Sequence, residues 1–382
     1  MGFKLEDEMF MREALILARR GLGKTSPNPL VGALVVKGGK ILGKGYHRRY
    51  GGAHAEVIAL KNAQGDVKGA CMYVTLEPCC HFGWTPPCVN AIVEAGVSEV
   101  VIGTPDPNPR VNGKGIQFLR DHGIQVKVGV LEERCQELNE AYFKYIQTGM
   151  PFVTLKFAQS LNGRIATKTG RSQWISSPET LRLAHKLRST HDAVLVGIGT
   201  TLADDPSLTV RLVKGQNPQR IIVDSRLRIP LTAQILSDEG VDRTIIVATE
   251  GANRKKALRI QHLGAEILWA EKNRRGGVDL RDLLEKLGHM GITSVLVEGG
   301  SQIITSFLRK KLADKIVIVM APKLIGKGIE ALGDLEILSL KEALRISRMK
   351  TKRIGGDIVI EGYLHRESRR PRTRNDRSKT PR

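Results

Sequence analysis

The sequence predicts an α/β protein of two domains, each a three-layer α/β/α domain in which helices cover both faces of a sheet. Three observations favour this fold class. The chain has 382 residues, more than a single hydrophobic core usually accommodates. Short apolar runs typical of strands alternate with stretches of helical periodicity in both halves. Turn-forming residues at Gly149-Met150-Pro151 separate the halves, so we expect domains at residues 1–149 and 150–364.

The first half opens with an amphipathic helix, expected over residues 6–21, in which Phe10 and Leu17 lie on one face. Two apolar runs then flank the turn at residues 37–40 and predict a β-hairpin over 30–46. Further apolar runs predict the rest of this half. They indicate strands at 71–76, 97–102 and 124–128, and helices at 53–63, 87–95 and 131–147.

Apolar strand runs and helical stretches also alternate in the second half, which predicts a mostly parallel sheet with helices on both faces. The expected strands are residues 152–157, 193–196, 220–223, 244–248, 294–297 and 315–320, and the clearest helices are 178–188 and 280–287. Residues 365–382 are rich in Arg, Ser, Thr and Pro and lack apolar anchors, so we expect a basic, disordered tail.

The formal net charge of the chain is +21, of which +6 comes from the segment that starts at Arg366. Such a charge suits anionic ligands such as phosphates, nucleotides or nucleic acid, and it equally serves solubility. Five cysteines are too few for a disulfide framework in a chain of this length. No N-terminal apolar segment and no apolar run of transmembrane length occurs, so we expect a reduced, cytoplasmic protein that does not enter a membrane.

The residues that carry chemistry in the first half are His54-Ala55-Glu56, Pro78-Cys79-Cys80 and Pro87-Cys88. One imidazole and two thiolates can hold a catalytic zinc ion and leave its fourth position open, where the pKa of water falls to about 7. A carboxylate two positions from the imidazole can carry the proton of that water. The pattern matches the signature of zinc nucleobase deaminases. It predicts His54, Cys79 and Cys88 as zinc ligands and Glu56 as the catalytic proton carrier.

Two features of this motif leave alternatives open. Cys80 is the neighbour of Cys79, and we assign Cys79 as the ligand because it follows Pro78 directly. The spacing from Cys79 to Cys88 is longer than the Cys-x-x-Cys of the deaminase signature, so the intervening residues must loop out. A purely structural zinc site is the main alternative.

The second half carries a weaker signal, for an anion site. A buried strand is expected to end at Glu298, and Gly299-Gly300-Ser301 then opens a helix. Glycines at such a junction let backbone N–H groups approach a phosphate, which the helix dipole also attracts. A tight strand-to-helix turn explains the same residues equally well. Gly197-Ile198-Gly199-Thr200 follows another strand in the same way, but neither segment is the dinucleotide fingerprint Gly-x-Gly-x-x-Gly.

With these motifs, the chain resembles the family of bifunctional riboflavin biosynthesis proteins known as RibD. Residues 6–130 resemble its pyrimidine deaminase domain and residues 152–363 its reductase domain. The deaminase motifs are Pro27-Asn28-Pro29-Leu30-Val31-Gly32, His54-Ala55-Glu56, and residues 75–88 with the long spacing between cysteines that this family shares. The reductase motifs are Lys156-Phe157-Ala158, residues 160–167 and 172–175, Val196-Gly197-Ile198-Gly199-Thr200, Asp204-Asp205-Pro206-Ser207-Leu208, Val297-Glu298-Gly299-Gly300 and Ala321-Pro322-Lys323-Leu324.

The resemblance implies a cytidine-deaminase-like first domain and a dihydrofolate-reductase-like second domain. It implies zinc-dependent deamination of 2,5-diamino-6-(5-phosphoribosylamino)pyrimidin-4-one. It also implies that NADPH then reduces the ribosyl group of 5-amino-6-(5-phosphoribosylamino)uracil to ribityl. One zinc ion and NADPH are thus the implied cofactors, and a phosphorylated pyrimidine is the implied small-molecule substrate.

The resemblance also implies the residues of the binding sites. NADPH would contact Ala158, Trp174, Thr200, Asp204, Ser225, Gly300, Ser301, Gln302, Ile303, Ile304, Thr305 and Ser306. Substrate would contact Asn28, Ser172, Arg188, Leu208, Arg211 and Glu298. Arg188 and Arg211 suit the ribose phosphate because guanidinium groups form paired bonds with phosphate oxygens. Residue type together with the resemblance makes Lys156, Asp204 and Glu298 the candidates for ring opening and proton delivery.

Two other functions compete with this interpretation. A nucleic-acid-editing zinc deaminase would fit the motif and the charge, but only 4% of the residues are aromatic, which leaves few stacking platforms for bases. A zinc-stabilised scaffold whose basic tail binds polyanions would leave Glu56 without a role. We therefore expect no nucleic-acid partner, and we expect a homo-oligomer.

Overall fold

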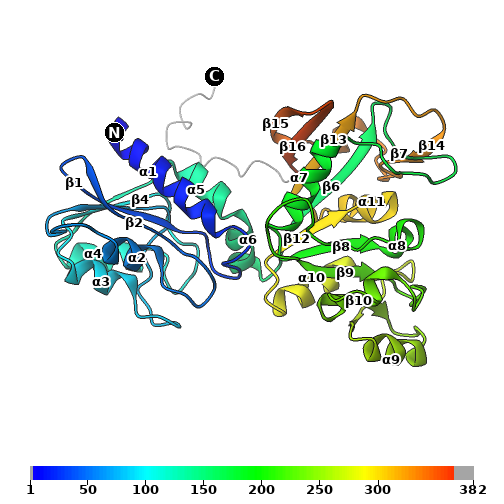
Figure 1. Cartoon of the computed structure of the whole chain (residues 1–382), viewed down its shortest axis with the longest axis horizontal. Coiled ribbons are helices and arrows are strands. Elements are labelled where there is room, and N and C mark those ends of the chain that lie inside the picture. Colours follow the sequence, from blue (N-terminus) through cyan, green and yellow to red (C-terminus); the bar gives the residue numbers. More distant parts are fainter. Residues whose placement is uncertain (1–2, 365–382) are drawn as a thin grey trace, which may run out of the picture.

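The structure is a computed structural model that describes residues 3–364, and its two main sheets lie on either side of α6 (Glu140–Thr148) (Figure 1). The five-stranded first sheet has the order β2-β1-β3-β4-β5, with β1 antiparallel to both neighbours and β3, β4 and β5 parallel. Its strands are β1 Gly32–Lys37, β2 Lys40–Tyr46, β3 Cys71–Val74, β4 Glu99–Ile102 and β5 Gln125–Val128. Its helices are α1 Leu5–Ala18, α2 Ala55–Lys61, α3 Cys88–Glu94, α4 Lys114–Asp121 and α5 Glu132–Leu138.

Helices cover both faces of this first sheet, as the sequence predicted. One face packs against α2, α3 and α4 through fully buried residues such as Ala59, Ile92 and Leu119. The opposite face packs against α1 and α5, whose Phe10 and Cys135 are buried. Figure 1 shows the two groups of helices on opposite sides of the strands. The apolar stripes of these helices therefore close one core on each face of the sheet.

The prediction of one long helix over residues 131–147 is wrong, because the helix is interrupted at Asn139, which separates α5 from α6. Asn139 is buried, and its side chain pairs with the backbone of Leu30. Its Oδ1 accepts the Leu30 N–H at 2.7 Å, and its Nδ2 donates to the Leu30 carbonyl at 2.9 Å. An asparagine that bonds to backbone groups in this way competes with continuation of the helix.

The second sheet has nine strands in the order β11-β10-β9-β8-β12-β6-β13-β16-β15. The pairs from β11 to β13 are parallel and only those that involve β16 are antiparallel, so the sheet is mostly parallel, as predicted. Its strands are β6 Phe152–Ser160, β8 Ala193–Gly197, β9 Gln219–Val223, β10 Thr244–Thr249, β11 Glu266–Ala270, β12 Ser294–Glu298, β13 Lys315–Ala321, β15 Ser347–Ile354 and β16 Asp357–Tyr363. A separate small sheet pairs β7 Arg164–Thr167 with β14 Gly328–Glu330.

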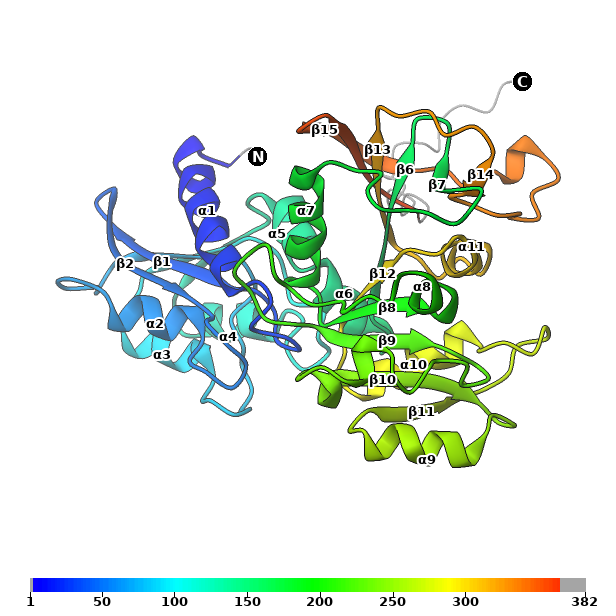
Figure 2. The ribbon, with the colours of Figure 1, turned by 45° about the vertical axis from the view of Figure 1, so that its right-hand side comes forward.

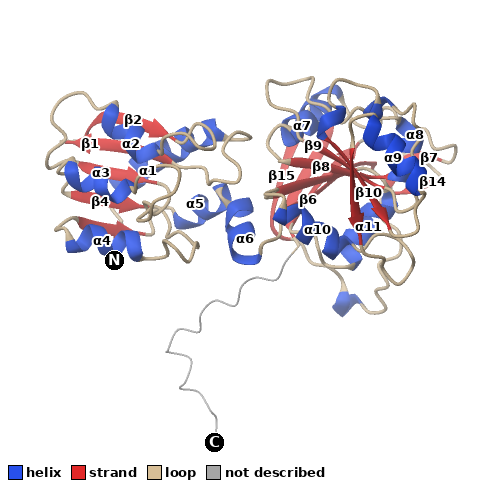
Figure 3. Ribbon diagram, turned by 90° about the horizontal axis from the view of Figure 1, so that it is seen from below, coloured by secondary structure: helices blue, strands red, loops and turns tan. Residues whose placement is uncertain are grey.

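Helices also cover both faces of the second sheet. They are α7 Pro178–Arg188, α8 Ile198–Asp204, α9 Arg254–His262, α10 Leu280–His289 and α11 Ser301–Arg309. Successive strand residues face opposite sides, so Leu195 packs toward α10 and α11 whereas Val196 packs toward α9. Figure 3 shows α10 and α11 on the opposite side of the strands from α9. The start of α7 agrees with the prediction, since the Ser177 side chain accepts the Thr180 N–H and Pro178 occupies the first turn.

Parallel pairing brings the carboxyl ends of β6, β8, β9 and β12 to one edge of this sheet, where open α/β folds bind their ligands. The tail predicted for residues 365–382 lies outside the described residues. Within residues 3–364, no helix combines the length and the apolar character that crossing a bilayer requires.

Candidate active sites

The three predicted zinc ligands come together at the amino ends of two helices. His54 immediately precedes α2, Cys88 is the first residue of α3, and Cys79 lies on the loop after β3. The His54 Nδ1 atom lies 3.1 Å from Cys88 Sγ and 3.5 Å from Cys79 Sγ, and all three donor atoms lie within 4.8 Å of one another. Bonds of about 2.0 Å to nitrogen and about 2.3 Å to sulfur can reach one ion from donors so spaced. The donor set therefore fits zinc.

The protonation of the thiols also suits a metal site. The hydrogen bond from the Cys88 thiol, reinforced by one from His54, lowers the pKa of Cys79 to about 4. The backbone N–H of Cys88 donates to Cys79 Sγ at 3.3 Å as well. Cys79 is thus prepared as a thiolate, the form that binds metal. Cys80 does not join the cluster, because its Sγ faces the Arg110 carbonyl at 3.6 Å.

A buried carboxylate anchors the loop that carries Cys79. The side chain of Glu77 accepts backbone N–H groups from Gly113, Ile116 and Asp106 at 3.0, 3.1 and 3.2 Å. Two of these donors belong to the start of α4, so the loop after β3 is tied to that helix. The sequence patterns did not single out Glu77, although its place two residues before a ligand was a possible signal.

Glu56 lies in the first turn of α2 and is 3% exposed. Burial, and then the charge of Cys79, raise the pKa of Glu56 to about 7. A carboxyl group with such a pKa can both take up and release a proton near neutral pH. The structure therefore places a carboxyl group with a pKa suited to proton transfer beside the predicted metal ligands.

Asn28 reaches the cluster through His47, a residue that the sequence patterns did not single out. The His47 ring lies edge-on to the His54 ring, with centroids 5.4 Å apart. His47 Nδ1 donates to the Ala53 carbonyl at 3.1 Å, and burial lowers the pKa of His47, so its Nε2 accepts from Asn28 Nδ2 at 3.2 Å. A single histidine after a strand forms no sequence motif, so the role of His47 is recognised only from its contacts with Asn28 and His54.

A cavity of about 1580 Å³ lies at the carboxyl edge of the second sheet. Single-ligand pockets measure about 300–1,000 Å³, so this one has room for a cofactor and a substrate. Its wall includes the predicted residues Lys156, Ala158, Ser172, Trp174, Arg188, Thr200, Asp204, Leu208, Arg211, Ser225, Glu298, Gly300, Ser301, Gln302, Ile303, Ile304 and Ser306. Thr305 is not on this wall. Its hydroxyl donates to the Ser301 carbonyl and accepts the Gly333 N–H.

Arg188 and Glu298 form a buried ion pair in this cavity, so Arg188 does not lie on a solvated helix face. Arg188 Nε and Nη2 donate to the two carboxylate oxygens of Glu298 at 3.0 and 2.6 Å. Burial by itself would raise the pKa of Glu298, but the charges of Arg188 and Lys156 outweigh burial and lower it. Two donors of the guanidinium that we expected to bind phosphate are therefore engaged with Glu298.

The glycines before α11 form a tight turn that opens on the cavity. Gly299 and Gly300 have φ values of +68° and +66°, and a Cβ on Gly300 would lie 2.8 Å from Thr200 Oγ1. Only glycine tolerates both this backbone conformation and this approach. The turn brings α8 and the first turn of α11 together on the cavity wall, where the N–H groups of α11 can face a phosphate.

His185 is a second cavity residue that the sequence patterns missed. Its Nδ1 accepts the Arg211 N–H at 3.0 Å, so a proton on the neutral ring must sit on Nε2. Burial, and then the charges of Arg188 and Arg211, lower the pKa of His185. The sequence signal that could have indicated His185 is its position three residues before Arg188, which puts both side chains on the same face of α7.

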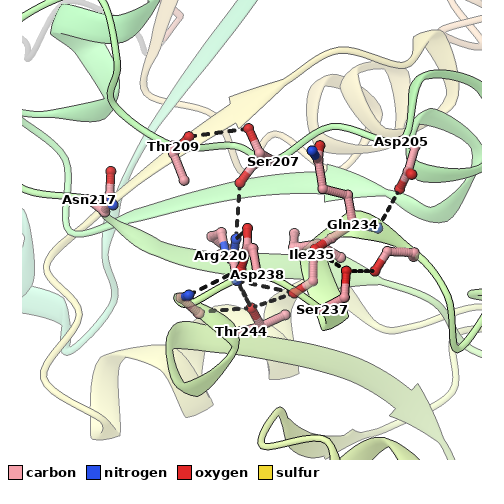
Figure 4. A network of polar contacts seen from close by, with 12 residues as sticks. Asp205, Ser207, Thr209, Asn217, Arg220, Gln234, Ile235, Ser237, Asp238 and Thr244 are labelled. Carbon is pink, nitrogen blue, oxygen red and sulfur yellow. Dashed lines mark hydrogen bonds and ion pairs between the residues drawn. The ribbon is translucent and has the colours of Figure 1, made fainter.

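A buried arginine holds the loop that carries Leu208 (Figure 4). Arg220 on β9 is 1% exposed, pairs with both oxygens of Asp238 at 2.5 and 2.8 Å, and donates to the Ser207 carbonyl at 3.1 Å. Asp205 and Leu208 have left-handed φ values of +40° and +53°, which such residues keep only where their surroundings impose them. Arg220 is part of these surroundings, so it shapes the cavity wall from behind.

Two family models match the chain. The RibD C-terminal domain matches residues 151–360, and the cytidine and deoxycytidylate deaminase zinc-binding region matches residues 4–104. The riboflavin biosynthesis protein RibD of Aquifex aeolicus is 46% identical over 355 residues, which are 93% of this chain and 97% of that protein.

Solved structures of relatives agree with these matches. RibD of Acinetobacter baumannii is 36% identical with a TM-score of 0.85, and the match covers 94% of this chain and 99% of that one. A Thermotoga maritima protein, described as a diaminohydroxyphosphoribosylaminopyrimidine deaminase and 5-amino-6-(5-phosphoribosylamino)uracil reductase, is 35% identical with a TM-score of 0.79 at the same coverage.

These matches confirm the resemblance, together with the cytidine-deaminase-like first domain and the dihydrofolate-reductase-like second domain. They do not favour a nucleic-acid-editing deaminase, because the relatives match both halves of the chain and not the zinc region alone. The chain therefore belongs to the RibD family of bifunctional riboflavin biosynthesis enzymes, in which a zinc-binding deaminase domain is joined to a reductase domain.

Proposed function

We propose that the deaminase domain, residues 1–149, removes an amino group from 2,5-diamino-6-(5-phosphoribosylamino)pyrimidin-4-one. The reductase domain, residues 150–364, then reduces the ribosyl group of the product to ribityl with NADPH. The observation that carries the proposal is the buried Glu56 carboxyl beside the cluster of His54, Cys79 and Cys88. The description of the Thermotoga maritima relative names these two activities and supports the choice of substrate.

In the deaminase site, zinc held by the three ligands would lower the pKa of water to about 7 and so supply a nucleophile at neutral pH. Glu56 takes the proton that the attacking water loses and passes it to the ring nitrogen beside the attacked carbon. It then moves the proton of the new hydroxyl group to the amine, which leaves as ammonia. A pKa of about 7 suits both transfers. Asn28 directs its Nδ2 at His47, so its Oδ1 is free to accept an N–H of the pyrimidine.

In the reductase site, NADPH would supply the hydride that adds to C1 of the sugar. The ring oxygen must gain a proton as the sugar ring opens, and we assign its delivery to Lys156, whose charged form the neighbouring Glu298 carboxylate favours. Asp204 is oriented by the Ser172 hydroxyl, which donates to its Oδ1 at 3.2 Å. The backbone N–H of Arg211 is fixed by His185, and Arg211 Nη1 donates to the Ser207 and Thr209 hydroxyls. We assign the remaining donors of this guanidinium to the ribose phosphate.

Incubating the purified chain with the diaminopyrimidine phosphate, with and without NADPH, tests the proposal. Ammonia release should occur without NADPH, whereas loss of nicotinamide absorbance should require both NADPH and the deaminated product. If the zinc-loaded chain released no ammonia, the proposed substrate would be refuted.

Metal analysis of four variants tests the site itself. Cys79→Ala and Cys88→Ala should abolish bound zinc, because two of the three protein donors would remain. Cys80→Ser is the matched control and should retain zinc, since its thiol faces the Arg110 carbonyl. Glu56→Gln should keep zinc but lower ammonia release by about 1,000-fold, within the range for loss of a general acid–base group. Full activity of Glu56→Gln would refute the role of this carboxyl group.

A further inference from the structure

The loop after α1 packs directly on the reductase domain. Gly23 in this loop has φ +71°, and a Cβ there would lie 2.2 Å from the Ser189 carbonyl oxygen of the segment that follows α7. Figure 2 shows the dark-blue loop after α1 beside the green segment that follows α7. The two domains therefore meet backbone to backbone at this point, so a shift of one segment moves the other.

A single carboxylate oxygen joins the domains beside this contact. Asp192 Oδ2 accepts the Ser26 hydroxyl of the deaminase domain at 2.8 Å, and the Ser26 hydroxyl oxygen also lies 3.1 Å from the Thr293 hydroxyl oxygen. Asp192 Oδ2 also accepts the Thr293 N–H at 2.8 Å, the Thr293 hydroxyl at 2.7 Å and the Ser294 N–H at 3.1 Å. Three bonds within the reductase domain thus hold Asp192 in place, and the fourth reaches across to Ser26.

Ser26 belongs to the loop that leads to the deaminase site. Two residues later, the Asn28 N–H donates to the Thr25 carbonyl at 2.8 Å, and the Asn28 side chain meets His47 at 3.2 Å. The His47 ring in turn lies against the ring of His54. A continuous series of contacts therefore runs from Asp192 to the predicted metal ligands.

We propose that Asp192, a residue of the reductase domain, is a positioning residue for the deaminase. By holding Ser26 it fixes residues 25–28, and this places Asn28 and His47 beside the metal-ligand cluster. The inference rests on the proposed deaminase function. Its physical basis is that a catalytic arrangement displaced by about 1 Å can lose about 100-fold in rate.

The fold predicts that this effect is selective for the deaminase. Asp192 precedes β8, whereas the residues of that strand that line the reductase cavity, Val196 and Gly197, lie at its other end. Four residues of strand span about 13 Å, so along β8 a change at Asp192 lies well away from the cavity wall.

Four single variants and one double variant of the full chain test the inference. Ser26→Ala and Asp192→Ala each remove the bond between Ser26 and Asp192, and the Ser26→Ala/Asp192→Ala double variant tests whether the two residues act through one contact. Asp192→Asn is the conservative rescue, because an amide oxygen can still accept the Ser26 hydroxyl. Tyr145→Phe is the matched control. It removes another interdomain bond, from the Tyr145 hydroxyl to the Gly288 carbonyl at 3.2 Å, that does not involve the loop.

Two readouts follow each variant: kcat/KM for ammonia release, and hydrogen exchange of the Asn28 amide. Ser26→Ala and Asp192→Ala should each lower kcat/KM about tenfold, and the double variant should be no worse than Asp192→Ala. The Asn28 amide should exchange faster in both single variants and at the wild-type rate in Asp192→Asn and Tyr145→Phe. Reductase turnover on the deaminated product should stay unchanged in Ser26→Ala, which keeps Asp192 and its three internal bonds.

Wild-type exchange of the Asn28 amide in Ser26→Ala and Asp192→Ala, or additive effects of the two changes on kcat/KM, would overturn the inference. Failure of the wild-type chain to release ammonia would instead refute the proposed substrate. The exchange measurement decides the positioning role of Asp192 in either case, because it does not depend on turnover.

Discussion

Lys156 in the middle of β6 and Glu298 at the carboxyl end of β12 are register partners on two neighbouring parallel strands. Both line the reductase cavity, and their charges act on each other. Burial lowers the pKa of Lys156, and the charge of Glu298 opposes this in part. Lys156 therefore loses its proton more easily than an ordinary lysine. The negative charge of Glu298 limits how far the pKa of Lys156 falls.

Replacing Glu298 by glutamine tests the carboxylate in the reductase reaction. Glu298→Gln keeps the shape of the side chain and removes its charge, so reductase kcat should fall by about 100-fold, at the lower end of the range for a general acid–base group. Ammonia release serves as the internal control and should not change, because Glu298 belongs to the other domain. Full reductase turnover in steady-state assays would contradict the assignment.

The pH profile of the reductase tests Lys156. Lys156 carries a proton below its pKa and is neutral above it, and burial lowers that pKa. Turnover should therefore fall as pH rises, beginning below the pKa of about 10.4 of an ordinary lysine. Loss of the Glu298 charge lowers the pKa of Lys156 further, so this alkaline limb should move to lower pH in Glu298→Gln. A limb that stays in place or moves to higher pH would show that Lys156 is not the proton donor.

Arg220→Met should destabilise the reductase domain, because it leaves Asp238 and several buried acceptors without their partner. Breaking a buried ion pair costs about 3–5 kcal/mol, and the lower figure applies because the Asp238 side chain is 26% exposed. Urea unfolding measures the change. Arg12→Ala, which breaks the exposed pair with Glu8, is the control and should cost about 0.3 kcal/mol. Similar losses in the two variants would show that the Arg220 network adds nothing to stability.

Gly300→Ala should weaken NADPH binding, because the new methyl group would meet Thr200 Oγ1 and force the turn before α11 to move. We expect the Kd for NADPH, measured by fluorescence titration, to rise about tenfold or more, which is about 1.4 kcal/mol of binding free energy. Gly291→Ala is the matched control: its φ is also left-handed, at +79°, but no atom lies within 4 Å of the added Cβ. Equal Kd values for the two variants would exclude a role for the turn.

Asn139→Ala should destabilise the deaminase domain by about 2 kcal/mol, because the Leu30 N–H and carbonyl lose their buried partners. The exposed Asn62 donates one bond to the Lys44 carbonyl, so Asn62→Ala should change stability by less than about 0.5 kcal/mol. Thermal unfolding compares the two. A loss below 0.5 kcal/mol for Asn139→Ala would mean that the α5–α6 break has another cause.

Much of this protein could be predicted from the sequence because the information is local. The hairpin of β1 and β2 follows from two apolar runs around Gly38-Gly39, and α7 follows from Ser177-Pro178 ahead of a helical pattern. The motif His54-Ala55-Glu56 places a donor and a carboxylate on one helix start, so their proximity needs no knowledge of the rest of the chain.

What only the tertiary structure decided are the contacts between residues far apart along the chain. Asn139 interrupts a helix because its side chain hydrogen-bonds to the backbone of Leu30. The Arg188 guanidinium pairs with the Glu298 carboxylate, and the Ser26 hydroxyl donates to Asp192 across a domain boundary. In each case the partner lies more than 100 positions away. Periodicity and motif spacing describe short stretches of chain, whereas a buried polar group takes whichever partner folding brings within reach.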